Sequence, residues 1–237
     1  MEQALEDLVA ANRILAAHGV IDAYGHVSLR SPRDPNRYYV ARAIAPETVQ
    51  LEDILEYDLD SRPVNDKGRE SVRERFIHGE IYKARPDVNA VVHNHSPSVV
   101  PFSVTRVWMR PIFHMAAFVG EGVPNFEIRN AQKGTDLLVK TPSLGEALAK
   151  TLGKSPAALM RGHGSVTVGE TLPRAVGRSV YLEMSARMQL QAIAIAGPRG
   201  KIVYLDDGEV QASVPGQDYN RAWPMWRAKA LASLKPR

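Results

Sequence analysis

Three histidines are the main candidates for chemistry in this sequence. His93 and His95 lie at the end of the apolar run NAVVHNHS, and His163 lies between two glycines in RGHG. If the run is a strand, His93 and His95 project from the same face, because side chains two residues apart share a face. Neutral imidazole binds divalent metals such as zinc, manganese, cobalt and iron. The pattern predicts a metal site with these three ligands, and structural histidines are the alternative.

The turn that carries His163 can bring the ring to the strand that carries the other two. Glycine at both neighbouring positions allows a sharp reversal of the chain between two apolar segments. The other four histidines are each interpreted, taken singly, as structural or supporting side chains, and they are His18, His26, His78 and His114.

Helical and extended patterns alternate along the chain, and they must position these histidines. Helices are expected at 3–18, 70–85, 96–104, 143–153 and 171–197, and in the last 20 residues, with Ser143 capping the fourth. Strands are expected at 25–31, 36–44 and 89–96, within 48–65 after a helical turn, on both sides of the glycine turn in 157–169, and at 200–210. The segment 106–142 yields no assignment.

This alternation predicts a single α/β domain over residues 1–237, with helices covering a central sheet and a helical tail from about residue 215. The 237 residues are 44% hydrophobic and carry a net charge of +4, which argues against disorder. The basic residues are scattered, so no nucleic-acid partner is expected.

The absence of cysteine excludes disulfides and thiolate metal sites. No apolar stretch reaches the roughly 20 residues of a membrane span, and the amphipathic, acidic N-terminus differs from a signal peptide. We therefore expect a cytoplasmic protein with no membrane partner.

The motifs RERFIHGEIYKARPDVNAVVHNHSP and ALMRGHGSVTVG together resemble the class II aldolase/adducin family. The resemblance implies a three-layer α/β/α sandwich around a largely antiparallel mixed sheet. It also implies a divalent metal, usually zinc, bound by His93, His95 and His163. Glu74 matches the family's acid/base glutamate, which is sometimes a ligand. Enzymes of the family are commonly homotetramers with active sites at subunit interfaces.

Two departures from the sugar-phosphate aldolases of this family bear on the substrate. His26 in YGHVSLRS stands where those enzymes have the asparagine of a phosphate-binding loop, and ARAIAPETV lacks the Ser-Gly pair of their second loop. Phosphate cradles need small residues with free N–H groups. A sugar-phosphate substrate is therefore disfavoured. A scaffold of the adducin type is disfavoured because this chain keeps the metal-binding histidines.

The segments RPIFHMAAFVGEGVPNFEIRN and ALMRGHG are most similar to a decarboxylase branch that acts in bacterial degradation of aromatic compounds. The resemblance implies a metal-dependent decarboxylase of 3,4-dihydroxyphthalate or of a muconate-type semialdehyde. The alternatives are a class II aldolase acting on a non-phosphorylated hydroxy-oxo acid, a non-catalytic scaffold and, more distantly, an iron-dependent oxygenase.

A small anionic substrate of this kind needs a proton donor and cationic anchors. Glu74, His114 and Arg161 are the expected catalytic residues. His26, Arg30, Arg42 and Tyr181 are the expected substrate-binding residues. His26 and His114 are equally compatible with structural roles, and for Tyr181 a place in the core is the favoured interpretation. Arg106 and Arg110 are further candidates for the anchors.

Overall fold

The computed structural model describes residues 2–232 and contains a seven-stranded sheet in the order β3-β2-β1-β4-β7-β6-β5. The strands are β1 (His26–Arg30), β2 (Arg37–Ala41), β3 (Ile54–Asp58), β4 (Ala90–Asn94), β5 (Asn125–Phe126), β6 (Ala157–Met160) and β7 (Gly164–Gly169). Neighbouring strands are antiparallel, except that β5 runs parallel to β6. The sheet is therefore mixed and largely antiparallel, which confirms the predicted fold class.

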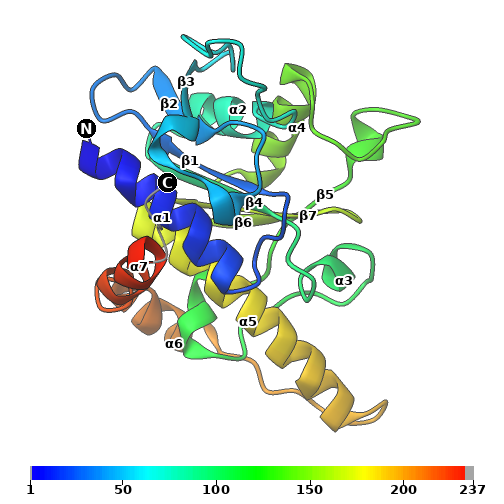
Figure 1. Cartoon of the computed structure of the whole chain (residues 1–237). Helices are drawn as coiled ribbons and strands as arrows, with labels where there is room; N and C mark the ends of the chain where they lie inside the picture. The colour runs from blue at the N-terminus through cyan, green and yellow to red at the C-terminus, as the bar shows by residue number, and fades with distance from the viewer. Residues whose placement is uncertain (1, 233–237) are drawn as a thin grey trace.

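Helices cover both faces of the sheet, as Figure 1 shows, with α2 and α4 on one side and α1 and α5 on the other. The longer helices are α1 (Glu2–Ala17), α2 (Phe76–Ala84), α4 (Pro142–Leu152), α5 (Leu172–Ala196) and α7 (Trp223–Ala232), and the shorter ones are α3 (Val100–Ser103) and α6 (Asp207–Ser213). The last residues of the predicted C-terminal helix, 233–237, lie outside the described residues.

The central strand β4 is buried on both faces, which explains why its sequence is almost continuously apolar. Val91 packs in the core beneath α2 and α4, whereas Ala90 and Val92 pack in the core beneath α1 and α5. Because side chains alternate between faces, His93 lies on the same face as Val91. The strand therefore places the first predicted metal ligand under α2.

The helix pair α2 and α4 packs closely because Gly145 has no side chain. A Cβ atom at this position would lie 2.5 Å from the carbonyl oxygen of Phe76 and 2.8 Å from the side chain of Glu80. This contact fixes α2, which contributes buried polar side chains to the site described below.

The predicted strand at 200–210 is wrong. Residues 200–206 make no strand, and α6 begins at Asp207. The side chains of Asp206 and Glu209 form a reciprocal capping box, a local signal for a helix start that outweighs the short apolar run before it. None of residues 200–206 is fully buried, and Val203 is 90% exposed, so this run has no buried face that would stabilise a strand.

Two helix starts also differ from the prediction. The helix expected from residue 70 begins at Phe76, because Arg75 donates to the backbone carbonyls of Ser61 and Val72 and holds the preceding residues in a turn. The helix expected at Ser143 is capped instead by the side chain of Thr141. Pro142 then occupies the first turn, where its missing N–H group is not needed.

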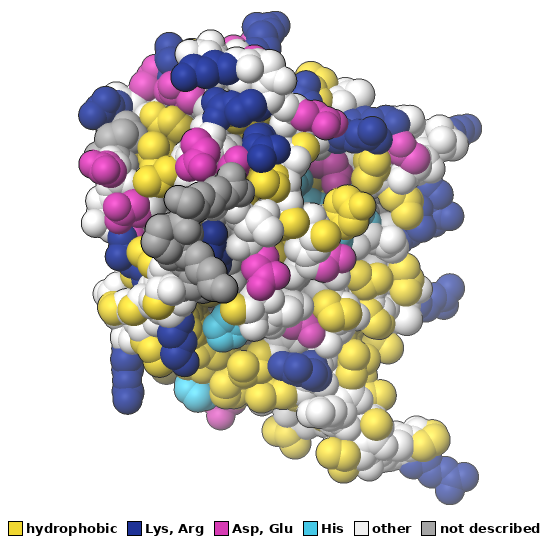
Figure 2. Space-filling model, viewed as in Figure 1, with side chains coloured by type: hydrophobic (Ala, Val, Ile, Leu, Met, Phe, Trp, Pro, Cys, Tyr) yellow, Lys and Arg dark blue, Asp and Glu magenta, His cyan; other side chains and the backbone are white. Residues whose placement is uncertain are grey.

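No helix among residues 2–232 is both long and apolar enough to span a membrane. On the face shown in Figure 2, lysine and arginine side chains are spread around the outline with acidic side chains among them. This distribution agrees with the scattered basic residues of the sequence.

Candidate metal centre

The three predicted ligands and Glu74 meet at one end of the central strands. His93 is in β4, His95 follows the end of β4, His163 lies in the turn between β6 and β7, and Glu74 lies in the turn before α2. One ligand atom from each of the four side chains lies within 4.8 Å of the other three. Pairing of β4 with β7 brings the two histidine-bearing segments together, since Asn94 is opposite Ser165 in the register.

The turn that carries His163 depends on its glycines, as the sequence predicts. Gly162 has a φ of +65°, in the left-handed region that favours glycine. A Cβ atom at Gly164 would collide with the backbone carbonyl of Asn94. Both glycines are therefore needed for β7 to start beside β4 with His163 facing the cluster.

Two backbone carbonyls orient the histidine rings. The Nδ1 atom of His93 lies 3.2 Å from the carbonyl oxygen of Ser165, and Nδ1 of His163 lies 3.0 Å from that of Leu137. A carbonyl oxygen only accepts hydrogen bonds, so each Nδ1 carries the proton and each Nε2 presents a lone pair. Both rings therefore have the tautomer that a metal ligand needs.

The spacing of the converging atoms suits a tetrahedral ion. Nε2 of His95 is 3.0 Å from Nε2 of His163, and Oε2 of Glu74 is 3.5 Å from Nε2 of both His93 and His163. Zinc–nitrogen bonds of about 2.0–2.1 Å place two tetrahedral ligands roughly 3.3 Å apart. Nε2 of His93 is also fully buried without a hydrogen-bond partner. This orphaned lone pair and the donor set fit a divalent metal ion.

Glu74 is held as a buried carboxylate at the edge of the cluster. Its Oε1 atom accepts a hydrogen bond of 2.7 Å from the backbone N–H of Val139. Burial alone raises the pKa of Glu74, but the contributions of His93, followed by His163 and His26, hold this pKa well below its ordinary value. The carboxylate is therefore ionised and adds negative charge beside the three imidazoles.

The imidazoles of His95 and His163 are in the neutral form at pH 7. Burial, with a contribution from His93, lowers the pKa of His163 to about 4, and burial also lowers the pKa of His95. Neutral imidazole is the form that binds metals. The exposed carboxylate of Asp22, which the sequence did not single out, lies 3.9 Å from Nδ1 of His95.

Three of the five predicted arginines, Arg30, Arg42 and Arg161, differ in their positions relative to the cluster. Arg42 directly follows β2. Ser28 of β1 is opposite Val40 of β2, so extending this antiparallel pairing by two residues places the Arg42 backbone opposite His26. Its Nε atom is held by Asp53 at 2.7 Å. Arg161 lies in the turn before His163, but its Nε atom is paired with Glu127 at 2.9 Å.

Arg30 is not brought to the cluster. It ends β1, four residues from His26, which is roughly 13 Å along a strand. All three guanidinium nitrogens donate to backbone carbonyls, those of Val88, Pro35, Tyr82 and Arg85. Its position supports a role in connecting β1 to the end of α2.

His114 and Tyr181 also lie outside the four-residue cluster. His114 is exposed at the start of a 3₁₀ helix, and its ring packs edge-on against Phe113. Tyr181, in α5, belongs to an aromatic group with Tyr219 and Trp226. Its packing agrees with the structural alternative considered from the sequence.

His26 lies directly beside the cluster. It is paired with His93 across β1 and β4, and the two ring centroids are 5.1 Å apart. On its other side, Nδ1 of His26 is 2.6 Å from Nε2 of His78 in α2. The sequence offered His78 only as a structural or supporting residue. The i, i+4 spacing of His78 and Tyr82 on a helix was the available signal that they act together.

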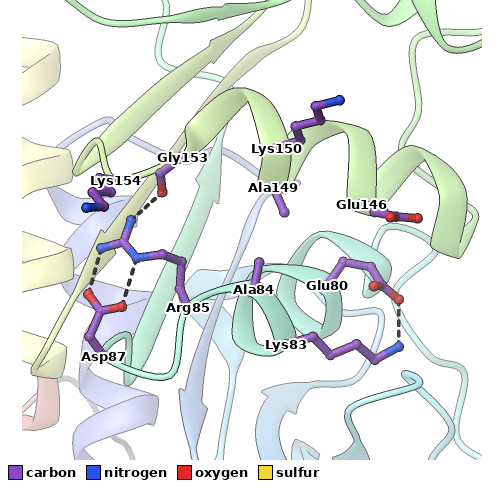
Figure 3. A pocket seen from close by; sticks show the side chains of 10 residues that line it. All are labelled: Glu80, Lys83, Ala84, Arg85, Asp87, Glu146, Ala149, Lys150, Gly153 and Lys154. Carbon is purple, nitrogen blue, oxygen red and sulfur yellow. Dashed lines mark hydrogen bonds and ion pairs between the residues drawn. The ribbon is translucent and has the colours of Figure 1, made fainter.

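A separate groove of about 1040 Å³ lies between the C-terminal ends of α2 and α4 (Figure 3). Four of its seven charged side chains form ion pairs with one another: Lys83 is paired with Glu80, and Arg85 is paired with Asp87 and donates to the carbonyl of Gly153. The groove contains none of the four cluster residues. The metal centre is therefore the stronger candidate for chemistry.

The comparison with protein families agrees with this fold and site. The Class II Aldolase and Adducin N-terminal domain matches residues 6–190, so the chain belongs to this family. The structure is also similar to an L-fuculose 1-phosphate aldolase from Glaciozyma antarctica, with a TM-score of 0.76 and 24% identity over 97% of this chain and 87% of the other. At this identity the structural match supports the fold alone.

Relatives with named activities include decarboxylases. Decarboxylase tropJ of Talaromyces stipitatus is 33% identical over 92% of this chain and 90% of its own length. A 3,4-dihydroxyphthalate decarboxylase of Arthrobacter keyseri is 28% identical over 82% of this chain and 80% of its own. The predicted membership in the family, with similarity to its decarboxylases, is confirmed.

Replacing His163 with alanine is expected to weaken metal binding by at least about tenfold, since even the loss of a ligand's supporting partner costs that much. The measurement is metal content by mass spectrometry after desalting. His114→Ala is the matched control, because His114 is exposed and outside the cluster. Equal metal content in the wild type and His163→Ala would contradict the ligand assignment.

Proposed function

We propose that the protein is a divalent-metal-dependent decarboxylase of a small, anionic, hydroxylated aromatic acid. The observation that carries this proposal is the convergence of three histidine Nε2 atoms and the Glu74 carboxylate, one Nε2 being buried without a partner. The decarboxylase relatives support the reaction class. We further propose zinc as the metal, 3,4-dihydroxyphthalate or a muconate-type semialdehyde as the substrate, and aromatic degradation in a bacterial cytoplasm as the context.

Loss of CO2 breaks a carbon–carbon bond and leaves its electron pair on the substrate. A divalent ion held by His93, His95 and His163 supplies a Lewis acid that stabilises the charge on an adjacent substrate oxygen. The electron pair must then take up a proton at carbon. The chain therefore needs a group that transfers a proton next to the cluster.

Glu74 is the proposed proton-transfer residue. Its Oε1 atom is anchored by the Val139 N–H, whereas Oε2 faces the histidines. A carboxylate with one oxygen fixed and the other directed at the substrate site can take the proton of a substrate hydroxyl and return it to the carbon that loses CO2. His114 remains a proposed catalytic residue through the segment it shares with the decarboxylase branch, and Arg161 through its place beside the turn of His163.

Arg42 and His26 are the proposed substrate-binding residues at the cluster. Extending the pairing of β1 and β2 by two residues beyond Ser28 and Val40 brings their backbones opposite each other at the strand ends. Asp53 fixes the Nε side of the Arg42 guanidinium, which leaves its terminal nitrogens to form the forked hydrogen bonds that carboxylates accept. Arg30 and Tyr181 are the weaker proposals, because both are engaged in contacts of the fold.

We also propose that the chain assembles as a homotetramer with active sites at subunit interfaces. Two exposed hydrophobic side chains lie near the candidate metal centre. Val104 lies beside Gly162, which precedes the ligand His163, and Tyr24, which is 71% exposed, is close to Asp22, whose carboxylate faces His95. Trp108, beside Gly122, is a further exposed hydrophobic side chain, at 66%. Exposed apolar side chains gathered around a functional site are typical of a surface that another chain covers.

Light scattering coupled to size exclusion is expected to give a mass of about four times the 26.1 kDa of one chain. Tyr24→Ser combined with Trp108→Ser should reduce this mass if these side chains are covered in the assembly. A single-chain mass for the metal-loaded wild type would contradict the proposed tetramer.

Metal-loaded protein is expected to release CO2 from 3,4-dihydroxyphthalate and to yield a catechol monocarboxylate. Release should stop after chelation and return when zinc, manganese, cobalt or iron is added, because the metal stabilises the developing charge. Product analysis distinguishes the alternatives: cleavage of a hydroxy-oxo acid to pyruvate without CO2 would favour an aldolase. A chain that retains no stoichiometric metal would favour a scaffold.

Glu74→Gln is expected to keep the metal and to lower kcat by about 100-fold or more, since the amide cannot exchange the proton. The control is Glu80→Gln, because Glu80 is a buried glutamate of α2 that pairs with Lys83 outside the cluster. Rates from stopped-flow CO2 detection and metal content are measured together. Full activity of Glu74→Gln would disprove the acid/base assignment.

A further inference from the structure

A chain of buried hydrogen bonds leads from the metal centre into the core beneath α2. Nδ1 of His26 is 2.6 Å from Nε2 of His78, whose Nδ1 is 2.6 Å from the hydroxyl of Ser28. The Ser28 hydroxyl is in turn 2.7 Å from the hydroxyl of Tyr82. Ser28 and His78 are completely buried, and Tyr82 is 1% exposed. Water therefore supplies no alternative partner along this chain.

The protons of the chain can be arranged in two directions. Burial lowers the pKa of His78 to about 3 and raises that of Tyr82, so the imidazole is neutral and the phenol keeps its proton. In one direction, Tyr82 donates to Ser28, Ser28 to His78, and His78 to His26. In the reverse direction each of these bonds runs the other way, and His26 begins the chain as the donor.

The reverse direction leaves the Tyr82 proton almost without a partner. The other acceptor for this proton is the carbonyl oxygen of Asn89, at 3.5 Å, which exceeds the usual O–H···O range of about 2.5–3.0 Å. That carbonyl already accepts a bond of 2.8 Å from the backbone N–H of Arg30. A buried donor without a partner is costly. The direction that starts at Tyr82 gives the protons of Tyr82, Ser28 and His78 one acceptor each, at 2.6–2.7 Å.

His26 therefore accepts at Nδ1 and carries its own proton on Nε2. Nε2 lies on the side of the ring away from the hydrogen bond to His78. It has no hydrogen-bond partner among residues 2–232 and is not sealed from solvent, in contrast to Nε2 of His93. The electrostatic neighbours of His26 include His93, Glu74 and His95 of the cluster.

We propose that Tyr82, Ser28 and His78 are positioning residues that hold His26 in the Nε2–H tautomer, so that it donates a hydrogen bond to an oxygen of an anionic substrate at the metal centre. The role of His26 as a donor rests on the proposed function. The tautomer rests on the hydrogen-bond chain alone. His26 is thus assigned neither as a metal ligand nor as a base, since both would need a lone pair on Nε2.

The tautomer can be read directly by two-bond proton–nitrogen correlation of histidine-labelled protein, in the metal-free and zinc-loaded forms. His26 signals are assigned by their loss in His26→Asn. The expected result is a single tautomer protonated at Nε2 in both forms. Protonation at Nδ1 in the wild type would overturn the proposal, whether or not the protein releases CO2.

Tyr82→Phe removes the first donor of the chain. The Ser28 hydroxyl can then either donate to Nδ1 of His78 or accept a hydrogen bond from it. We expect mixed tautomers at His26 and a fall of about tenfold in kcat/KM, in line with one lost hydrogen bond to a charged substrate. Tyr38→Phe is the matched control, because Tyr38 is a fully buried tyrosine of the same core whose hydroxyl donates to Ser61 outside the chain. It should change neither value, and metal content should stay constant in both variants.

The contact with substrate has a readout that does not need turnover. Addition of 3,4-dihydroxybenzoate, a catechol carboxylate, to zinc-loaded protein should shift the Nε2–H signal of His26 in the wild type and in Tyr38→Phe. An unshifted signal at saturating ligand would overturn the donor role. Absence of CO2 release together with this shift would instead count against the proposed decarboxylation and leave the donor assignment standing.

Discussion

The burial of several imidazoles and a carboxylate at the end of an apolar sheet is the constraint on which the surrounding structure depends. A polar ring removed from water costs free energy unless its nitrogens find partners. Ser165 and Leu137 supply carbonyls to the Nδ1 atoms of His93 and His163. Every nitrogen that the backbone satisfies in this way leaves the opposite nitrogen directed at the cluster. The hydrogen bonds that satisfy the buried rings therefore also orient their free nitrogens for metal binding.

The same requirement accounts for the second group of buried polar residues. His26 lies next to His93 in the sheet, so its ring also lies under α2. His78 and Tyr82 face it from that helix, and Ser28 closes the chain from β1. The close packing of α2 and α4 at Gly145 keeps this layer in place. The supporting polar residues therefore extend from the cluster into the core.

The position of Glu74 shows how local and long-range forces compete. Helical periodicity suggested that it lies within a helix, but the chain turns at Arg75 and α2 starts at Phe76. The turn allows the carboxylate to accept the N–H of Val139, 65 residues away, and to face two histidines. A residue in a turn has a direction set by tertiary contacts, whereas the direction of a helical side chain follows the helix axis. The proposed acid/base role depends on that freedom.

Several features were determined by the sequence alone. The apolar run before His93, the glycines around His163 and the alternation of elements were sufficient to predict the layered fold and the segments that carry the three histidines. These are local signals, because strand period and turn geometry depend on neighbouring residues. The family resemblance, carried by two long motifs, added the metal and the match to Glu74.

Only the tertiary structure decided which polar residues share the site. Arg30 and Arg42 look alike in the sequence, yet Arg30 donates to four carbonyls of the fold. Arg42 is held by Asp53 just after β2, where the strand register, extended by two residues, places its backbone opposite His26. His78, which is separated by 52 residues from its partner His26, could not be linked to it by any local pattern. The wrong prediction of a strand at 200–210 has the same cause. Strand pairing and hydrogen-bond partners are set by segments distant in the chain, whose register the sequence does not encode locally.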